Sequence, residues 1–426
     1  MKAIKYISLM FLCVWGFSLQ AQTQDIDSTE YDMSVAAIIP FFTNLVVDSV
    51  GPPPRREWRM REIAMDHVNG MRWASYRLSE AGYDVKLNLY DEVPDTLGTQ
   101  LWELEDIDSC DIVMGPLQQS MLSRSLRTIE NSGAEHILLT KVNPHILNVG
   151  EHIRSIIPDQ TYFIESVIEK LLEDHYTDNV IFVMAGGADS ELEQQFLDLY
   201  PVQPAPYDSL FTDTLRFDTI MGSKNSIGSL QEKIQFYKRN VIVTLATRRS
   251  RSMLSNLQSA VQRNDSTEIY VYANSDLRNL GFIDLPFLSR TRTTIPVSGI
   301  TDWSDSTTTE AVQIYRDLYD TDPSEYAVRA HDAMLDAFIR KISAMPIDSA
   351  ILAEDSLATW DLSSLPAPIA TIFEWSQVSN SGGWVNSSWD LNTFLLGKWC
   401  ATDTIPGLLP FLEPQLDEEG FYIRPE

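Results

Sequence analysis

Ser190 is the side chain whose surroundings come nearest to those of a catalytic residue. It follows Gly186 and Gly187 after an apolar run, and a serine on a sharp turn after a strand can act as a hydrolase nucleophile. The Gly-x-Ser-x-Gly pattern is absent, however, and no histidine is marked as the base. Ser190 and Glu193 have instead the spacing of a capping box, in which each side chain bonds a free backbone N–H. The sequence therefore predicts that Ser190 caps a helix.

Other catalytic and metal-binding patterns are also incomplete. Gly186 and Gly187 resemble the start of a dinucleotide-binding loop, but the third glycine of such a loop is missing. Acid pairs such as Glu103 with Glu105 lie in polar stretches and are interpreted as solvated surface. The six histidines show no metal-ligand spacing beside a carboxylate or thiol. They are His67, His136, His145, His152, His175 and His331. We expect no catalysis, no metal and no cofactor.

The net charge of −28 limits the partners that this chain can attract. A charge of that sign repels phosphate backbones and anionic lipid, so nucleic-acid and membrane-surface roles are not expected. A length of 426 residues favours two or more domains. The hydrophobic content of 44% is ample for their cores.

The first residues have the pattern of a secretory signal peptide. Lys2 and Lys5 precede an apolar stretch at residues 7–17, and a small residue, Ala21, follows at the expected cleavage site. We assign residues 1–21 to the signal peptide and expect a periplasmic protein. The apolar stretch is shorter than the roughly 20 residues that cross a bilayer. Cys13 lacks the small preceding residues of a lipid-attachment site, so simple cleavage without membrane insertion is the preferred interpretation.

Two cysteines remain after cleavage, Cys110 and Cys400. Two cysteines do not make a disulfide scaffold, although an exported protein can form a disulfide. Cys110 opens an apolar run and is interpreted as a small buried hydrophobic residue. Whether the two thiols pair stays open at the level of sequence.

From residue 34 onward, short β-branched runs alternate with longer amphipathic stretches. The runs predict strands, and the stretches repeat apolar residues at three- and four-residue steps, as one helix face does. Predicted strands lie at 35–39, 83–90, 111–114, 136–140, 180–184, 215–217, 241–245 and 269–272. Predicted helices lie at 60–78, 96–105, 123–131, 162–173, 229–238, 252–263 and 322–342. This order predicts an α/β fold of doubly wound parallel sheets with helices on both faces.

Several motifs occur together along the chain. Tyr315-Arg-Asp-Leu-Tyr319 precedes Asp322-Pro-Ser-Glu-Tyr-Ala327 and His331-Asp-Ala333, and an earlier strand ends in Gly115-Pro116. In this order the motifs resemble those of the type I periplasmic solute-binding proteins, the branched-chain amino-acid-binding family. The similarity covers residues 34–390. The order of the motifs is specific, whereas each motif alone is weak.

The resemblance implies two Rossmann-like lobes, joined by a hinge, that close on a small molecule. We expect lobe I to comprise residues 30–155 and 276–343. Lobe II would then comprise residues 156–275 and 344–400. Residues 401–426, rich in proline and acidic residues, are expected to form a C-terminal tail.

The resemblance also implies that the loops after the strands of lobe I contact the ligand. Gln118, Gln119 and Ser120 follow the third strand, and Thr140 and Lys141 follow the fourth. Such loops and the helices that they precede present free N–H groups. The alternatives are that the first three residues cap a helix, that Thr140 bonds the backbone, and that Lys141 is solvated.

The resemblance implies two further ligand-binding residues. Tyr162, on the second lobe, matches an aromatic residue that contacts the ligand in relatives, and Asp276, after the strand at 269–272, is a candidate acid for a ligand amine. The alternative for Tyr162 is a place on the amphipathic helix face with Ile164 and Val167.

The chain departs from the family pattern at two loops. Thr140-Lys141-Val142 stands where amino-acid binders carry small hydroxyl residues and alanine, and the loop at Gly186 lacks a Tyr-Gly pair. We expect a non-catalytic extracytoplasmic protein that binds an amino acid, a peptide or a related solute, with an ABC-transporter permease as its membrane partner. The alternative is a cell-envelope scaffold whose degenerate cleft contacts a protein or a cell-wall fragment.

Overall fold

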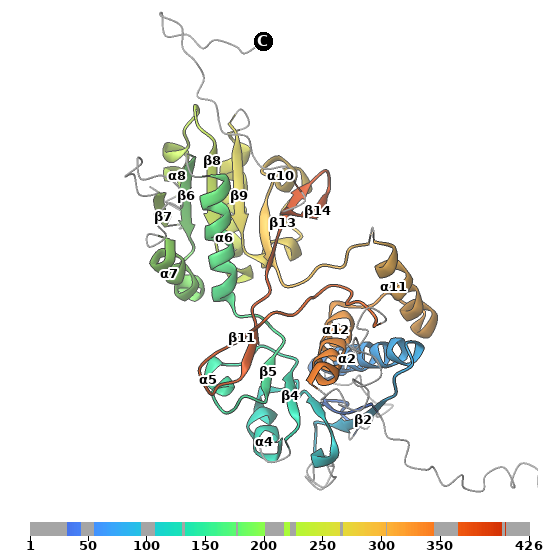
Figure 1. Cartoon of the computed structure of the whole chain (residues 1–426). Helices are drawn as coiled ribbons and strands as arrows, with labels where there is room; N and C mark the ends of the chain where they lie inside the picture. Colours follow the sequence, from blue (N-terminus) through green and yellow to red (C-terminus); the bar gives the residue numbers. More distant parts are fainter. Residues whose placement is uncertain are drawn as a thin grey trace, which may run out of the picture.

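The chain forms two seven-stranded sheets, each with its own layers of helices (Figure 1). The two-lobed α/β fold expected from the sequence is confirmed. The signal peptide, residues 1–21, and nearly all of the tail, residues 401–426, lie outside the described residues. The computed structural model describes residues 32–43, 55–94, 107–129, 133–175, 178–200, 217–221, 227–264, 267–303, 305–344, 365–402 and 405.

The first sheet has the strand order β11-β12-β5-β4-β3-β1-β2. All neighbours are parallel except β11 and β12. Its strands are β1 (Met33–Ile39), β2 (Val85–Asp91), β3 (Ile112–Met114), β4 (Glu135–Leu138), β5 (Ile153–Ser155), β11 (Trp375–Gln377) and β12 (Trp384–Asn386). Its helices are α2 (Arg55–Glu80), α4 (Gln119–Ile129), α5 (Pro144–Leu147), α11 (Ser306–Tyr319) and α12 (Glu325–Ala344), with a 3₁₀ turn η1 (Ile107–Ser109).

The second sheet has the strand order β14-β13-β10-β9-β8-β6-β7. Strands β10, β9, β8, β6 and β7 are parallel to one another, whereas β13 is antiparallel to both of its neighbours, β10 and β14. Its strands are β6 (Asn179–Met184), β7 (Phe217–Met221), β8 (Asn240–Thr244), β9 (Ile269–Ala273), β10 (Thr294–Val297), β13 (Asp390–Leu395) and β14 (Lys398–Ala401). Its helices are α6 (Gln160–Asp174), α7 (Ser190–Leu199), α8 (Ile227–Lys233), α9 (Arg251–Gln262) and α10 (Leu285–Arg290), with 3₁₀ turns η2 (Gly187–Asp189), η4 (Arg248–Ser250) and η5 (Ser275–Asn279).

Both faces of each sheet are buried, which explains why the strands are continuous apolar runs. Successive side chains of a strand point to opposite faces. In β8, Val241 and Val243 pack with α6 and α7, while Ile242 between them packs with α8, α9 and α10. In β1, Val35 packs with α2 and α12, while the neighbouring Ala36 joins a separate cluster on the other face.

Helices α2 and α12 cross at close range on the first sheet. A methyl group added to Gly70 of α2 would lie 2.1 Å from the carbonyl oxygen of Ala327 in α12. The glycine therefore allows the two backbones to touch. The face predicted for the helix at 322–342 is confirmed as buried: Ala327, Ala330, Met334, Phe338 and Ile342.

The expected lobe boundaries differ from the sheets that the chain forms. Residues 276–343 were expected in lobe I, yet β10 pairs with β9 and β13 in the second sheet. Residues 344–400 were expected in lobe II, yet β12 pairs in parallel with β5 of the first sheet. Pairing between strands so distant in sequence leaves no local pattern, so composition and periodicity do not reveal it.

The chain crosses between the lobes three times, and hydrogen bonds connect the first and third crossing segments. The crossings follow β5, β10 and β12, and Figure 1 shows the last of them as the red segment that runs between the lobes. Asn386 Nδ2 donates to the carbonyl oxygen of Ile156 at 3.3 Å. Thr371 Oγ1, in the first-lobe segment before β11, donates to the carbonyl oxygen of Ser298 in the second crossing at 3.1 Å. We call the three crossings together the joint between the lobes.

Candidate functional site

The carboxyl ends of the parallel strands in both sheets point to the joint between the lobes. The crossings leave β5, β10 and β12 at their carboxyl ends, and the parallel neighbours of these strands share that direction. Ligands of open parallel sheets bind beyond the carboxyl ends of the strands. We call residues 40–43, 92–94, 115–118 and 139–143 the first-lobe edge. We call residues 185–189, 245–250, 274–279 and 298–299 the second-lobe edge.

Glu92 fixes the loop after β3 at the first-lobe edge. Its buried carboxylate accepts the backbone N–H of Leu117 at 2.9 Å and that of Gln118 at 2.8 Å. Burial raises the pKa of Glu92 to about 7, although these two hydrogen bonds act in the opposite direction. Gly115 opens the loop with φ of 107°, and a methyl group there would lie 2.2 Å from the carbonyl oxygen of Ile38. Only glycine fits there without displacing the backbone.

The five ligand-binding residues predicted in lobe I lie at this edge and in the first turn of α4. Gln119 Nε2 donates to the carbonyl oxygen of Lys141 at 2.9 Å, which joins the loops after β3 and β4. Gln119, Ser120 and Lys141 are exposed, and Gln118 and Thr140 are half-buried. Contact of these side chains with a ligand stays a prediction.

Tyr162 lies where the two lobes meet. Its helix, α6, packs on the second sheet, yet its half-buried ring packs against a first-lobe cluster of α4, β4 and β5. Ile164 and Val167 pack in the second-lobe core, so Tyr162 does not share their face. The N-cap of α6, Asp159, accepts a hydrogen bond from Trp389 Nε1 on its carbonyl oxygen at 2.9 Å. The predicted role of Tyr162 in binding remains untested, but its position at the joint agrees with it.

Asp189 organises the second-lobe edge. Its buried carboxylate accepts the hydroxyls of Thr247 and Ser250, each at 2.6 Å, and the backbone N–H of Thr247 at 3.2 Å. These bonds connect the loop after β6 with the loop after β8. Both hydroxyls therefore donate their protons within the protein and do not offer them to a ligand.

The capping box predicted for Ser190 and Glu193 is wrong. Ser190 is the first residue of α7, and its hydroxyl donates to the carbonyl oxygen of Gly187 at 2.9 Å. Glu193 reaches back past the helix start and accepts the backbone N–H groups of Ala185 and Gly186. The carboxylate thus bonds the loop after β6, a target that the three-residue spacing from Ser190 to Glu193 alone does not distinguish from a cap.

Asp276 lies in η5, directly after β9, at the second-lobe edge. Its side chain is half-buried, and Oδ2 accepts the backbone N–H of Arg248 at 3.1 Å. One carboxylate oxygen therefore already has a donor from the protein. Its role as the acid for a ligand amine stays a prediction.

Exposed arginines at the second-lobe edge were missed by the sequence reasoning. Arg248 and Arg249 lie in η4 and Arg278 lies in η5, and all three side chains are exposed. The run Thr-Arg-Arg-Ser-Arg directly after an apolar strand was a signal for them, because it is strongly basic within a chain of net charge −28.

The described residues offer no site for a metal ion. No group of three or more histidine, cysteine, aspartate or glutamate side chains in them could hold one. Within the same residues, none of the helices has the length and apolar character to cross a bilayer.

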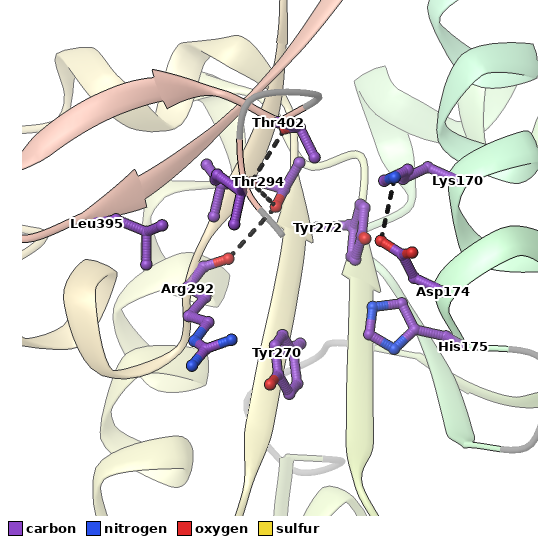
Figure 2. A pocket seen from close by; sticks show the side chains of 11 residues that line it. Lys170, Asp174, His175, Tyr270, Tyr272, Arg292, Thr294, Leu395 and Thr402 are labelled. Atoms are coloured by element: carbon purple, nitrogen blue, oxygen red, sulfur yellow. Dashed lines mark hydrogen bonds and ion pairs between the residues drawn. The ribbon is translucent and has the colours of Figure 1, made fainter. Parts of the chain in front are cut away.

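A small pocket lies at the opposite end of the second sheet, beside the amino ends of β9 and β10 (Figure 2). Many of its polar groups bond one another. Lys170 Nζ lies 3.2 Å from Asp174 Oδ2, and Thr393 Oγ1 lies 2.8 Å from Thr294 Oγ1 and 3.0 Å from Thr402 Oγ1. The pocket is remote from both edges, and we do not count it as part of the candidate site.

Comparisons with known proteins give a match of fold alone. No protein-family model matches the sequence, and no curated protein matches it. A protein from Rhodospirillum rubrum described as a branched-chain amino acid ABC transporter matches with a TM-score of 0.56 and 13% identity, over 87% of this chain and 99% of that one. An ABC transporter substrate-binding protein from Desulfitobacterium hafniense matches with a TM-score of 0.51 and 14% identity, over 87% and 98% of the two chains.

Proposed function

We propose that this chain, which has the fold of the type I periplasmic solute-binding proteins, binds a small solute between its lobes without chemical conversion. The observation that carries the proposal is the arrangement of the two edges. Both face one joint, in which hydrogen bonds connect the first and third crossings, at residues 156 and 386, and attach the second crossing to the first lobe, at residues 298 and 371. A joint of this kind permits hinge closure, which buries a solute between the edges.

The solute class is an amino acid, a peptide or a related molecule, as the fold and the two similar structures suggest. Gln118, Gln119, Ser120, Thr140 and Lys141 would contact it from the first lobe. Tyr162 and Asp276 would contact it from the second. The signal-peptide pattern at residues 1–21 supports a periplasmic location, where an ABC-transporter permease would be the membrane partner.

A thermal-shift screen tests this function. The chain without residues 1–21 is screened against the proteinogenic amino acids, dipeptides, dicarboxylates and muropeptides. A solute present at a hundred times its dissociation constant stabilises the folded state by about 2.7 kcal/mol, so a true ligand raises the unfolding midpoint. Small-angle scattering should then show a smaller radius of gyration with the ligand than without it. The absence of any shift across the panel, or a ligand that leaves the radius unchanged, would overturn the proposal.

A second candidate function, an envelope scaffold, is favoured by one surface of α2. Trp58, Met65 and Tyr76 are 47%, 40% and 42% exposed. Their spacings of seven and eleven residues return to nearly the same helix face at 100° per residue. An aromatic stripe of this kind suits a protein partner. If no solute binds and an envelope protein co-purifies with the chain but not with its Trp58→Ser variant, the scaffold function replaces the first.

A further inference from the structure

An ion pair connects the two lobes at the joint. Arg278 Nη2 in η5 of the second lobe lies 3.8 Å from Glu325 Oε2, at the first residue of α12 in the first lobe. The two side chains are 35% and 58% exposed. A pair this long and this exposed contributes little to stability. Its value is that it shows which side chains of the two lobes face each other.

Arg329 places a second cation beside this pair. It lies four residues after Glu325, one turn along the same face of α12, and its side chain is half-buried. Burial lowers the pKa of Arg329, Glu325 acts in the opposite direction, and Arg278 of the other lobe lowers the pKa further. Among the described residues, no ion pair or hydrogen bond engages its guanidinium.

Arg248 and Arg249 extend the cationic surface. The backbone N–H of Arg248 bonds Asp276, two residues before Arg278, so η4 and η5 are adjacent. Their exposed guanidinium groups have no ion pair within the described part of the chain. Carboxylates also lie here: Asp189 and Asp276 already accept hydrogen bonds from the protein, and Glu325 pairs with Arg278 across the lobes.

Like charges on opposite lobes oppose closure. Arg278 and Arg329 come from different lobes, and the single carboxylate of Glu325 neutralises the charge of only one of these arginines. A guanidinium binds an oxyanion through two parallel N–H donors, so an anion between the two arginines would turn their repulsion into a bridge. The net charge of −28 does not prevent this, because charges beyond about 8 Å are screened at physiological salt.

We propose that the solute is an oxyanion, a carboxylate- or phosphate-bearing small molecule, held between Arg278 of the second lobe and Arg329 of the first. This inference rests on the proposed function, because it requires a solute between the lobes. Arg248 and Arg249 raise the local concentration of anions at the second-lobe edge. An acidic amino acid would also suit Asp276, since its ammonium group would meet that carboxylate.

Matched pairs of solutes test the charge requirement. Isothermal titration calorimetry compares succinate with succinamide and glutarate with glutaramide, because the members of each pair differ chiefly in charge. Inorganic phosphate and glycerol 3-phosphate separate the phosphate arm from the carboxylate arm. We expect the anion of a pair to bind at least about tenfold more tightly than its neutral counterpart, and its affinity to fall as potassium chloride is raised.

Charge variants of the joint locate the anion. Arg278→Gln, on the exposed turn η5, should weaken binding of the anionic probe at least about tenfold, as loss of one charge-assisted contact does. Arg329→Gln should have a similar effect, with its fold checked by circular dichroism. Glu325→Gln removes the competing carboxylate and should strengthen binding. Arg263→Gln, an exposed arginine just after the far end of α9, is the matched control and should change nothing.

The outcomes separate the inference from the proposed function. Binding only of solutes that lack a carboxylate or phosphate group, or an anion affinity unchanged by Arg278→Gln, overturns the inference and leaves the solute-binding function standing. A panel in which no solute of any charge binds overturns both. Weaker anion binding in Arg278→Gln, together with stronger binding in Glu325→Gln, supports the inference.

Discussion

Buried carboxylates at both edges bind backbone N–H groups that a ligand carboxylate would otherwise use. Glu92 takes the N–H groups of Leu117 and Gln118 in the first lobe. Glu193 takes those of Ala185 and Gly186 in the second. These four N–H groups are therefore not available to an anion, whereas the exposed arginines of η4 and η5 are. This is the residue-level reason for expecting recognition by guanidinium groups at this joint.

Glu92 should make stability fall as the pH rises. Its pKa of about 7 in the folded chain exceeds its ordinary value of 4.5, so the folded state holds the proton between these values and the unfolded state releases it. The free energy of unfolding then decreases across this interval, by on the order of 3 kcal/mol in all. Urea unfolding of the wild type and of Glu92→Gln at about pH 5 and about pH 8 measures it.

The informative quantity is the difference in the free energy of unfolding between the wild type and Glu92→Gln at each pH. The variant has lost the titrating group and one acceptor, so it should be less stable than the wild type by more at the lower pH. A difference that stays constant across this range would contradict a raised pKa for Glu92.

At the scale of elements, glycine decides how closely α2 approaches α12. Gly70→Ala would place a methyl group 2.1 Å from the carbonyl oxygen of Ala327. We expect a loss of roughly 2–4 kcal/mol in the free energy of unfolding, as for other overpacked cores. Gly228→Ala in α8 is the control, because nothing lies within 4 Å of the added methyl group. It should be neutral or stabilise the chain by up to about 1 kcal/mol. Equal effects of the two substitutions in chemical denaturation would rule out the close crossing.

Elements with a strong period were predicted well, whereas the short strands β5 and β10 were missed. The helix α12 repeats apolar residues at helical steps over 20 residues, so its buried face was correct, although it begins at Glu325 rather than at the predicted 322. Strand β10 has four residues, Thr-Ile-Pro-Val, and Pro296 is unusual within a sheet. Its pairing with β9 and β13 is a tertiary effect that no local pattern reveals.

At the scale of the whole molecule, the two lobes separate the thiols. Cys110 precedes β3 of the first sheet and Cys400 lies in β14 of the second, and both are free. Cys110 is 5% exposed, and burial raises its pKa, whereas Cys400 is half-buried. We expect Ellman's reagent to modify Cys400 faster in the native chain and both thiols after unfolding. The thermal midpoint should be the same with and without a reductant. A Cys110–Cys400 peptide in a non-reducing digest would refute this arrangement.

The sequence by itself determined the α/β class, the buried strands, the long helices and the resemblance to two-lobed binding proteins, because these follow from local periodicity and short motifs. Only the tertiary structure decided the rest. It brought β12 beside β5, moved β10 into the second sheet, and set Arg278 and Glu325 face to face across the lobes. Strand pairing and contacts between lobes join residues far apart in the chain, and their energy depends on where the whole fold places them.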